Sequence, residues 1–432
     1  MLKKIYYKNN LNSIISNLNS RKEGINKEVN ESVEKILEDV KNRGDKALIE
    51  YAEKFDGFTI NNMQDILVKK EGIEQGAIAV GENFIRILKR TKSQITEFHK
   101  NQIDKSWSLY KENGVIMGQM VRPLKRVAVY VPGGTAAYPS TVLMNVIPAK
   151  LAGVKEIIMI TPVKNDGKVP DVILAAAKVC GIETIYKVGG AQAIGAVAYG
   201  TETIKKVDKI VGPGNIYVAT AKKLVFGTVD IDMIAGPSEV LVIADENANP
   251  KYIAADLMSQ AEHDKLSSSI LITTSEKIAD DVNKEMQTQV EDLPRKEIIK
   301  YSVENFGAAI IVNSIDEAFD VANEIAPEHL EILVEDPMSQ LPKVYNAGSI
   351  FLGENSPEPL GDYMSGTNHI LPTSGTAKFY SALGVYDFVK YSSYSYYPKD
   401  VLETFKDDVM EFAKLEGLEA HANSIKVRFE EE

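Results

Sequence analysis

The feature of this sequence that most constrains its fold is a repeated alternation of continuous apolar runs with helical patterns, which begins at residue 126. The run RVAVYV is followed by a Pro-Gly-Gly turn and then by residues with helical spacing. The alternation recurs in EIIMITP with VPDVILAAAKVCG, in TIYKVGG with AQAIGAVAYG, and in KIVGPGN with IYVATAKKLVFG. Strands that are apolar at every position are buried on both faces, so this pattern predicts a parallel sheet covered by helices.

A second series of the same kind begins at EVLVIADENANP, residues 239–250. It continues through the apolar runs SSSILITT, AAIIVNS, LEILVE and SIFLG, with helical patterns between most of them. The predicted fold class is therefore α/β, with two Rossmann-like parallel-sheet units, a helical N-terminal arm and a C-terminal helical tail. We expect a mostly helical region at residues 1–125, the first unit at 126–237, the second unit at 238–390 and the tail at 391–432.

The tail is predicted to be helical over DVLETFKDDVMEFAKLEGLEA and to end in a segment with strand-like alternation. A segment of this length cannot enclose a core of its own. We therefore expect it to pack on another domain or on another subunit.

Composition excludes several classes of protein. The formal net charge of −12 argues against binding to nucleic acid, and 44% hydrophobic with 25% charged residues is ordinary for a globular chain. The most apolar region, residues 143–163, is interrupted by Pro148, Lys150 and Lys155, and the N-terminal MLKKIYYKNNLNS lacks the apolar core of a signal peptide. The single cysteine, Cys180, ends an apolar helical run and is expected to be inert packing. A cytoplasmic protein without membrane spans is expected.

Four of the five histidines lie in short stretches rich in polar and turn residues. These stretches are SQAEHD, APEHLE, GDYMSGTNHILP and EGLEAHANS, and each combines a histidine with a carboxylate or an amide. In the first, Gln260 and His263 share one face of a helix whose start is signalled by Asn249-Pro250. The fifth histidine, His99, stands among Lys and Glu and is expected on the surface. Four such stretches are not typical of core histidines, so they indicate a functional site.

The stretch APEHLE predicts a turn directly before a strand. Pro327 disfavours helical geometry at Ala326, which places Glu328 and His329 at the strand's edge. Adjacent glutamate and histidine side chains can serve as a proton acceptor and donor. A Glu-His pair on a solvated loop is equally consistent with this stretch alone.

A metal site is one interpretation of the histidine-rich stretches. Gln260, His263, Asp362 and His421 form a nitrogen and oxygen ligand set suited to Zn²⁺, and such a site would join the tail to the second unit. A glutamine ligand is unusual, and no spacing rule predicts this set. The residues alone leave a metal site and a polar network equally open.

The glycine turns give an incomplete nucleotide signal. The sequence 212-GPGNIY-217 begins like the dinucleotide fingerprint but has Tyr217 where the third glycine belongs. The turns PGGTAA and GGAQAIG do not fit the fingerprint either. Glycines at the ends of parallel strands predict a ligand crevice without naming its ligand.

These same stretches carry a resemblance that runs from about residue 120 to the C-terminus, and more loosely before it. The runs RVAVYVPGG, VGGAQAI, DKIVGPGN, AGPSEVLVIAD, LMSQAEHD, APEHL, AGSIFLG, GDYMSGTNHILPT and EGLEAHANS occur in order and at family-like intervals. In these runs the sequence resembles the histidinol dehydrogenases.

The resemblance implies a reaction and a set of site residues. The reaction would be oxidation of L-histidinol through histidinal to L-histidine with two NAD⁺, the last steps of histidine biosynthesis. His329 would take the alcohol proton and Glu328 would activate water for the second oxidation. The implied zinc ligands, with one ion per subunit, are Gln260, His263, Asp362 and His421. The implied substrate contacts are Ser238, Gln260, His263, His329, Asp362, His369, Glu416 and His421. The implied cofactor contacts are Tyr130, Gln192 and Asn215.

The resemblance also implies a homodimer in which the tail carrying Glu416 and His421 reaches the partner's active site. Cys180 matches no catalytic position of the family. Two alternatives belong to other classes: a zinc hydrolase in which Glu328 acts on a metal-bound water, and a non-catalytic oligomer in which zinc only fixes the tail. We expect no nucleic-acid partner.

Overall fold

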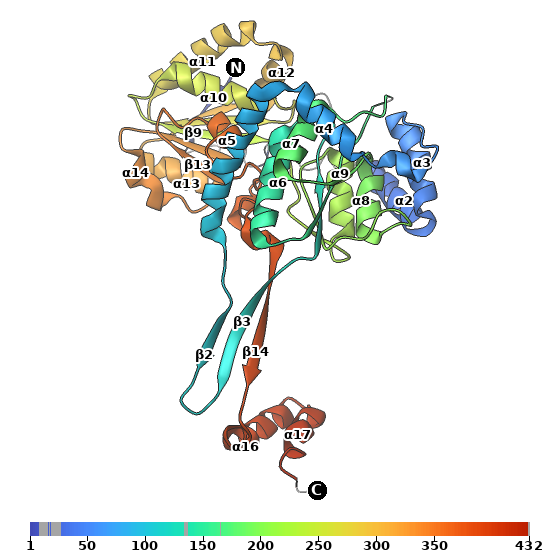
Figure 1. Cartoon of the computed structure of the whole chain (residues 1–432). Helices are drawn as coiled ribbons and strands as arrows, with labels where there is room; N and C mark the ends of the chain where they lie inside the picture. Colours follow the sequence, from blue (N-terminus) through green and yellow to red (C-terminus); the bar gives the residue numbers. More distant parts are fainter. Residues whose placement is uncertain (8–15, 17, 19–26, 134–136, 165, 431–432) are drawn as a thin grey trace. The chain divides into compact units, whose positions relative to one another are not determined.

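The computed structural model describes residues 1–7, 16, 18, 27–133, 137–164 and 166–430 (Figure 1). The chain divides into two compact units, one formed by residues 1–102 with 124–388 and the other by residues 103–123 with 389–432. Among the described residues, no helix is both long and apolar enough to cross a membrane.

The first sheet of the larger unit has five parallel strands. In spatial order they are β6 (Thr184–Tyr186), β5 (Glu156–Ile160), β4 (Arg126–Tyr130), β7 (Lys209–Val211) and β8 (Asp230–Ile231). The connecting helices are α6 (Pro139–Ala152), α7 (Asp171–Cys180), α8 (Gly190–Tyr199) and α9 (Ile216–Val225). Val127 and Val129 enter the core under α6 and α7, while Ala128 and Tyr130 enter the core under α8 and α9. Burial on both faces is the reason that the strands are apolar at every position.

The second sheet has six parallel strands. In spatial order they are β1 (Lys3–Tyr6), β11 (Ala308–Ile311), β10 (Ser268–Thr273), β9 (Glu239–Ala244), β12 (His329–Leu333) and β13 (Ser349–Leu352). One core lies under α10 (Pro250–Ala261), α11 (Glu276–Gln289) and α12 (Lys296–Phe306), and the other lies under α13 (Ile315–Ile325). The prediction of two parallel-sheet units is confirmed, and the N-terminal strand β1 adds an edge that the sequence did not reveal.

The two sheets share one topology. In each, the first strand of the series is central, the second and third lie on one side, and the fourth and fifth lie on the other. The strand order therefore reverses between β4 and β7 in the first sheet and between β9 and β12 in the second. In open α/β sheets, ligands bind outside the carboxyl ends of the strands at such a switch point.

The N-terminal region covers the first sheet from outside. Its helices are α2 (Lys27–Arg43), α3 (Asp45–Tyr51), α4 (Lys70–Ala79) and α5 (Gly81–His99). Helix α2 packs on α8 and α9, α4 packs on α7, and α5 packs on α6 and α7 (Figure 1). Because these faces join the two cores, the region belongs to the larger unit.

The surface prediction for His99 is wrong. Its side chain is completely buried at the end of α5, and its Nδ1 lies 2.7 Å from Oε1 of Gln102. The buried face of this helix carries Leu88, Thr91, Ile95 and His99, which are three or four residues apart. That helical period, rather than the charged neighbours in sequence, decides where the side chain points.

Cys180 ends helix α7 and is buried, as expected for inert packing. Burial raises the pKa of its thiol to about 12, so the thiolate needed for nucleophilic attack is not formed at neutral pH. The prediction for this residue is confirmed.

The smaller unit is an antiparallel ribbon followed by a helical hairpin. Its strands are ordered β14 (Val389–Tyr396), β3 (Ile116–Pro123) and β2 (Trp107–Tyr110), and its helices α16 (Lys399–Leu415) and α17 (Glu419–Lys426) pack on each other. The strand-like alternation predicted for the last residues is wrong, because α17 occupies them. In α16 only Val401 and Ala413 are buried, so the hairpin exposes most of its apolar side chains.

The remaining elements are short. They are α14 (Pro337–Gln340), α15 (Glu358–Tyr363) and the helical turns η1 (Ala52–Asp56), η2 (Met63–Ile66), η3 (Lys100–Gln102), η4 (Val290–Asp292), η5 (Leu341–Lys343), η6 (Thr376–Lys378) and η7 (Val385–Phe388). Of these, α15 matters most for function, because it carries two of the carboxylates described next.

Candidate active site

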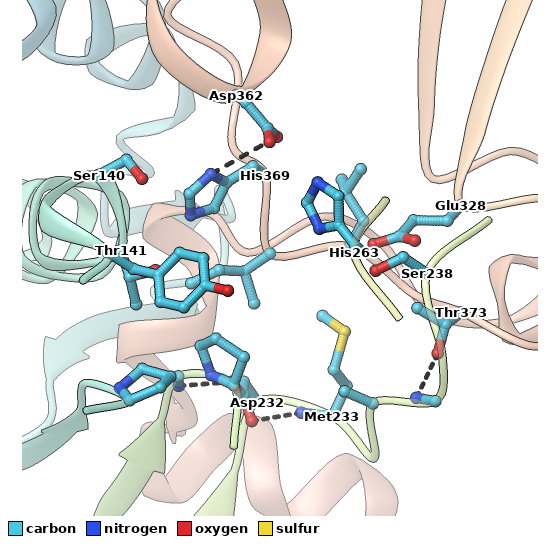
Figure 2. Close-up of a pocket in the computed structure, with 18 of the residues that line it drawn as sticks. Ser140, Thr141, Asp232, Met233, Ser238, His263, Glu328, Asp362, His369 and Thr373 are labelled. Carbon is cyan, nitrogen blue, oxygen red and sulfur yellow. Dashed lines mark hydrogen bonds and ion pairs between the residues drawn. The ribbon is translucent and has the colours of Figure 1, made fainter. Parts of the chain in front are cut away.

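A pocket of about 330 Å³ lies where the switch points of the two sheets meet within the larger unit. One wall comes from the carboxyl ends of β4 and β7, with Pro132 and the turn Gly212–Gly214. The facing wall comes from the amino ends of β9 and β12, with Ser238, Glu328 and His329. Residues 134–136 of the PGGTAA turn lie outside the described residues. Figure 2 shows that Glu328, Ser238 and His263 lie close together, while Asp232 and Met233 form another part of the lining.

The local backbone at Glu328 and His329 follows from the residues before them. Helix α13 ends at Ile325, and Ala326 takes a left-handed conformation with φ of 53°. Pro327 follows, and β12 begins at His329. This agrees with the predicted turn before a strand. Both side chains are buried, so the alternative of a pair on a solvated loop is wrong.

The backbone of Glu239, the first residue of β9, holds both side chains. Its N–H donates to Oε2 of Glu328 at 2.8 Å, and its carbonyl oxygen lies 2.9 Å from Nδ1 of His329. A carbonyl can only accept, so Nδ1 carries the hydrogen and Nε2 has the free lone pair. His329 is therefore oriented as a base, with Nε2 3.8 Å from Oε1 of Glu358.

Burial sets the protonation of this pair. It lowers the pKa of His329 to about 4, so its imidazole is neutral at neutral pH. It raises the pKa of Glu328 well above the ordinary carboxyl value. The wall thus carries a neutral imidazole ready to accept a proton and a carboxyl group whose affinity for a proton is increased.

Candidate metal ligands lie on the same side of the pocket. Helix α10 is capped by the side chain of Asn249, which accepts from Lys251 N–H, and it has Pro250 at its first position. Gln260 lies in its last turn and His263 in the turn that follows. Gln260 is buried, its Nε2 lies 3.3 Å from Nδ1 of His329, and its Oε1 has no hydrogen-bond partner among the described residues. A buried carboxamide oxygen without a partner, on a residue that lines the pocket, suits a bound cation.

Asp362 and His369 also line this pocket, and Oδ1 of Asp362 lies 3.6 Å from Nδ1 of His369 (Figure 2). Burial alone would raise the pKa of Asp362, but the contact with His369 outweighs it and leaves the pKa below the ordinary value. Asp362 is therefore ionised. An ionised carboxylate, an unpartnered amide oxygen and imidazoles around one cavity are a donor set that fits Zn²⁺.

Glu358 was not among the predicted site residues. It is buried at the start of α15, and one ligand atom each from Glu358, Asp362 and His329 lie within 4.8 Å of one another. Burial raises the pKa of Glu358 to about 8. A signal was available, because Glu358 and Asp362 are four residues apart and would share a helix face.

The predicted cofactor contacts gather at the carboxyl end of the first sheet. Tyr130 ends β4, and its hydroxyl accepts from Gly190 N–H at 3.2 Å. Gln192 is buried in the first turn of α8, while Asn215 caps α9 by accepting from the N–H groups of residues 217 and 218. None of the three lines the pocket itself, but Asn215 directly follows the lining turn Gly212–Gly214.

The structure thus brings seven predicted residues to one pocket, and they are Ser238, Gln260, His263, Glu328, His329, Asp362 and His369. Two others belong to the smaller unit. Glu416 is the C-terminal cap of α16, before Gly417 with φ of 76°, and His421 lies in α17. Both are exposed in the single chain.

A buried histidine base and a carboxyl group on one wall, facing a glycine turn of a Rossmann-like sheet, define an α/β enzyme of the dehydrogenase class. The family model described as "Histidinol dehydrogenase" matches residues 19–429. The chain belongs to the histidinol dehydrogenase family, and it is an oxidoreductase.

The similarity to individual members extends over the whole chain. It is 66% identical to the histidinol dehydrogenase of Lactococcus lactis subsp. lactis over 431 residues, covering 100% of both chains. Its identity to that of Clostridium acetobutylicum is 59%, covering 94% of this chain and 93% of the relative. The crystal structure of histidinol dehydrogenase from Elizabethkingia anophelis superposes with a TM-score of 0.88 at 41% identity, covering 92% of this chain and 91% of that one.

Proposed function

We propose that the chain oxidises L-histidinol through histidinal to L-histidine, with reduction of two NAD⁺. The observation that carries this proposal is His329, which is buried, neutral and oriented with Nε2 free, opposite the glycine turn of a Rossmann-like sheet. Bound nicotinamide would supply the hydride acceptor in each oxidation. The relatives from Lactococcus lactis and Clostridium acetobutylicum are named for this substrate, and they match 100% and 94% of this chain, respectively.

His329 and Glu328 divide the proton transfers between them. In the first oxidation, Nε2 of His329 accepts the alcohol proton as hydride leaves the carbon. In the second, the Glu328 carboxylate takes a proton from the water that attacks the aldehyde, and His329 acts again as base on the hydrate. A carboxylate with a raised pKa is a better acceptor than an ordinary one, and burial supplies that increase here.

We further propose that Gln260, His263, Asp362 and His421 hold one zinc ion per subunit. The ion would orient the substrate by binding its nitrogen atoms. The unpartnered Oε1 of Gln260 and the ionised Asp362 support this assignment. Ser238, His369 and Glu416 are the proposed further substrate contacts, and Tyr130, Gln192 and Asn215 are the proposed cofactor contacts.

A homodimer in which the tail serves the partner's site is the proposed assembly. Helix α16 exposes 66% of Phe412 and 82% of Leu415, and a second copy of the chain would cover this apolar surface. The exposed positions of Glu416 and His421 on the same hairpin support a role between subunits. We also propose a cytoplasmic location, because the lone cysteine is a buried free thiol.

The test is NADH formed per L-histidinol consumed, before and after removal of metal by a chelator. We expect two NADH per substrate, loss on chelation and recovery with zinc. Formation of only one NADH per L-histidinol would contradict the proposed role of Glu328, and formation of none would contradict the proposed dehydrogenase activity. The family assignment disfavours the zinc hydrolase, which would form no NADH. A non-catalytic oligomer with a purely structural zinc would also form no NADH, with or without chelation.

His421→Ala tests the ligand set and the exchanged tail together. We expect the variant to fold and to lose most of its bound zinc, and His99→Gln serves as a control that removes a histidine outside the pocket. Retention of a full zinc equivalent by His421→Ala would count against the proposed ligands. Active enzyme that sediments as a monomer would count against the exchange.

A further inference from the structure

A buried ion pair lies directly beneath the glycine turn of the first sheet. Lys222 comes from the second half of α9 and Asp232 directly follows β8. Their side chains are 3% and 1% exposed, and the Nζ of Lys222 contacts Oδ1 of Asp232. Both residues line the pocket. A buried pair of charges is no more stable than a well-packed apolar pair, so stability alone does not account for it.

The pair binds both polar groups of the Gly212 backbone. The Nζ of Lys222 donates to the Gly212 carbonyl oxygen at 2.9 Å, and Gly212 N–H donates to Oδ2 of Asp232 at 2.7 Å. Met233 N–H donates to Oδ1 of Asp232 at 2.7 Å, as Figure 2 shows. The pair therefore fixes the first peptide groups of the turn that leads to Asn215.

The backbone of Gly212 is also restrained by its own conformation and by Tyr130. Its φ of 108° lies in the region that glycine favours, and a Cβ atom there would collide with the carbonyl oxygen of Tyr130. The turn is thus held between the end of β4 on one side and the ion pair on the other. Loss of the pair would release one of these two restraints.

The position of Asp232 has a counterpart in ordinary dinucleotide sites. There, an acidic residue about 20 residues beyond the glycine turn binds a ribose hydroxyl. Asp232 lies 20 residues beyond Gly212, but here its oxygens accept from Gly212, Met233 and Lys222. At this position the acidic side chain therefore binds the backbone of the glycine turn.

We propose that Lys222 and Asp232 are positioning residues that fix the Gly212–Asn215 turn in the shape that receives the dinucleotide. This inference rests on the proposed function, because it assigns the turn to NAD⁺. The pair acts through the backbone and touches no reacting atom. It therefore controls cofactor affinity rather than the chemical steps at His329.

The test compares Lys222→Met with wild type in the zinc-loaded enzyme. Titration with NADH, followed by fluorescence, gives the dissociation constant without turnover, and initial rates give the two KM values. We expect at least a tenfold rise in the NADH dissociation constant and in the KM for NAD⁺. The KM for histidinol and kcat should stay within about threefold of wild type, as expected for a lost binding interaction.

Two further variants separate positioning from general stability. Lys222→Met/Asp232→Asn leaves no unpaired buried charge, and the asparagine oxygen still accepts from Gly212 N–H, so we expect it to bind NADH more tightly than Lys222→Met alone. The matched control is Lys209→Met/Asp230→Asn. It removes a pair on the same strands β7 and β8, with 3.0 Å between Nζ and Oδ2, at the opposite end of the sheet. We expect unchanged NADH binding there.

Several results would overturn the assignment. Equal NADH affinity in Lys222→Met and wild type would remove the pair's role. If Lys222→Met weakened the binding of NADH and histidinol equally and lowered the melting temperature, the ion pair would have only a structural role. A gain in NADP⁺ turnover by Asp232→Asn would mean that Asp232 contacts the ribose. Wild-type enzyme that binds NADH but forms none from histidinol would contradict only the proposed function, and wild type that binds no NADH would contradict both.

Discussion

The two sheets have the same strand order but contribute opposite ends to the pocket. The first presents the carboxyl ends of β4 and β7, and the second presents the amino ends of β9 and β12. A helix begins where a parallel strand ends, so the first sheet presents helix N-termini, as at Asn215 before α9. A helix ends near the amino edge, so the second sheet offers side chains at a helix C-terminus, as at Gln260 in α10.

The difference gives the two walls opposite electrostatic character. Helix N-termini favour anions and helix C-termini favour cations. The first wall suits the phosphates of a dinucleotide, while the second suits a metal ion and a proton-accepting base. One topology used from its two ends therefore provides two chemically different surfaces.

The largest expected effect comes from removing the base on the second wall. His329→Gln retains the shape of the side chain but cannot accept a proton, so kcat/KM for histidinol should fall by about 10² to 10⁴. NADH binding, measured by fluorescence, should be unchanged, because the first wall is untouched. His99→Gln, an equal change at a buried histidine outside the pocket, is the control. Comparable activity of the two variants would contradict the division of roles.

The next effect comes from the first wall. In Gly212→Ala the new Cβ meets the Tyr130 carbonyl oxygen at a φ that alanine rarely adopts, so the unfolding free energy should fall by about 1–3 kcal/mol. The KM for NAD⁺ should rise at least tenfold, while zinc content stays at one equivalent. Urea unfolding, initial rates and metal analysis measure the three quantities. Loss of zinc without loss of cofactor binding would reverse the assignment of the walls.

The pH dependence of stability tests a buried histidine that lies outside the pocket. Burial lowers the pKa of His99 below its ordinary value near 6.5, so the unfolded chain binds this proton more readily than the folded one. Its contribution to stability is complete above about pH 6.5 and is lost as the pH falls. His99→Gln should therefore flatten the decline of unfolding free energy below pH 6.5, measured in urea. An unchanged slope would show that His99 is not the group responsible.

The smallest effect is expected at the left-handed residue of the second wall. Ala326 already carries a Cβ at φ of 53°, so Ala326→Gly relieves strain while adding freedom to the unfolded chain. These terms oppose each other, and the unfolding free energy should change by less than about 1 kcal/mol. Urea unfolding, initial rates and metal analysis measure these effects, as for Gly212→Ala. A large loss of activity here would mean that the bend before Glu328 tolerates no change.

The sequence predicted the sheets because their strands are apolar at every position, which only burial on both faces explains. It also predicted the start of α10 and the turn before β12, because Asn249-Pro250 and Pro327 act locally. Seven candidate site residues line one pocket, and the family resemblance was necessary to choose them.

Other features depend on contacts that local patterns do not encode. β1 pairs with β11, which lies far from it in the sequence at residues 308–311, and the four residues KKIY carry no sign of that partner. The segment for which strand-like alternation was expected belongs to a helix of the hairpin. The burial of Glu358 depends on the packing of α15, and no residue pattern indicated which end of the second sheet would face the pocket.

The pairing of β1 has a consequence for synthesis on the ribosome. The backbone of Leu2 is bonded to Asn283 across 281 residues, and β1 joins the sheet beside β11 at residues 308–311. At about 5–20 residues per second, the first strand must wait roughly 15–60 seconds for its partner to emerge. The first sheet, encoded in between, can be complete by then. The nascent chain should therefore complete its first sheet before its second, with β1 among the last elements to dock.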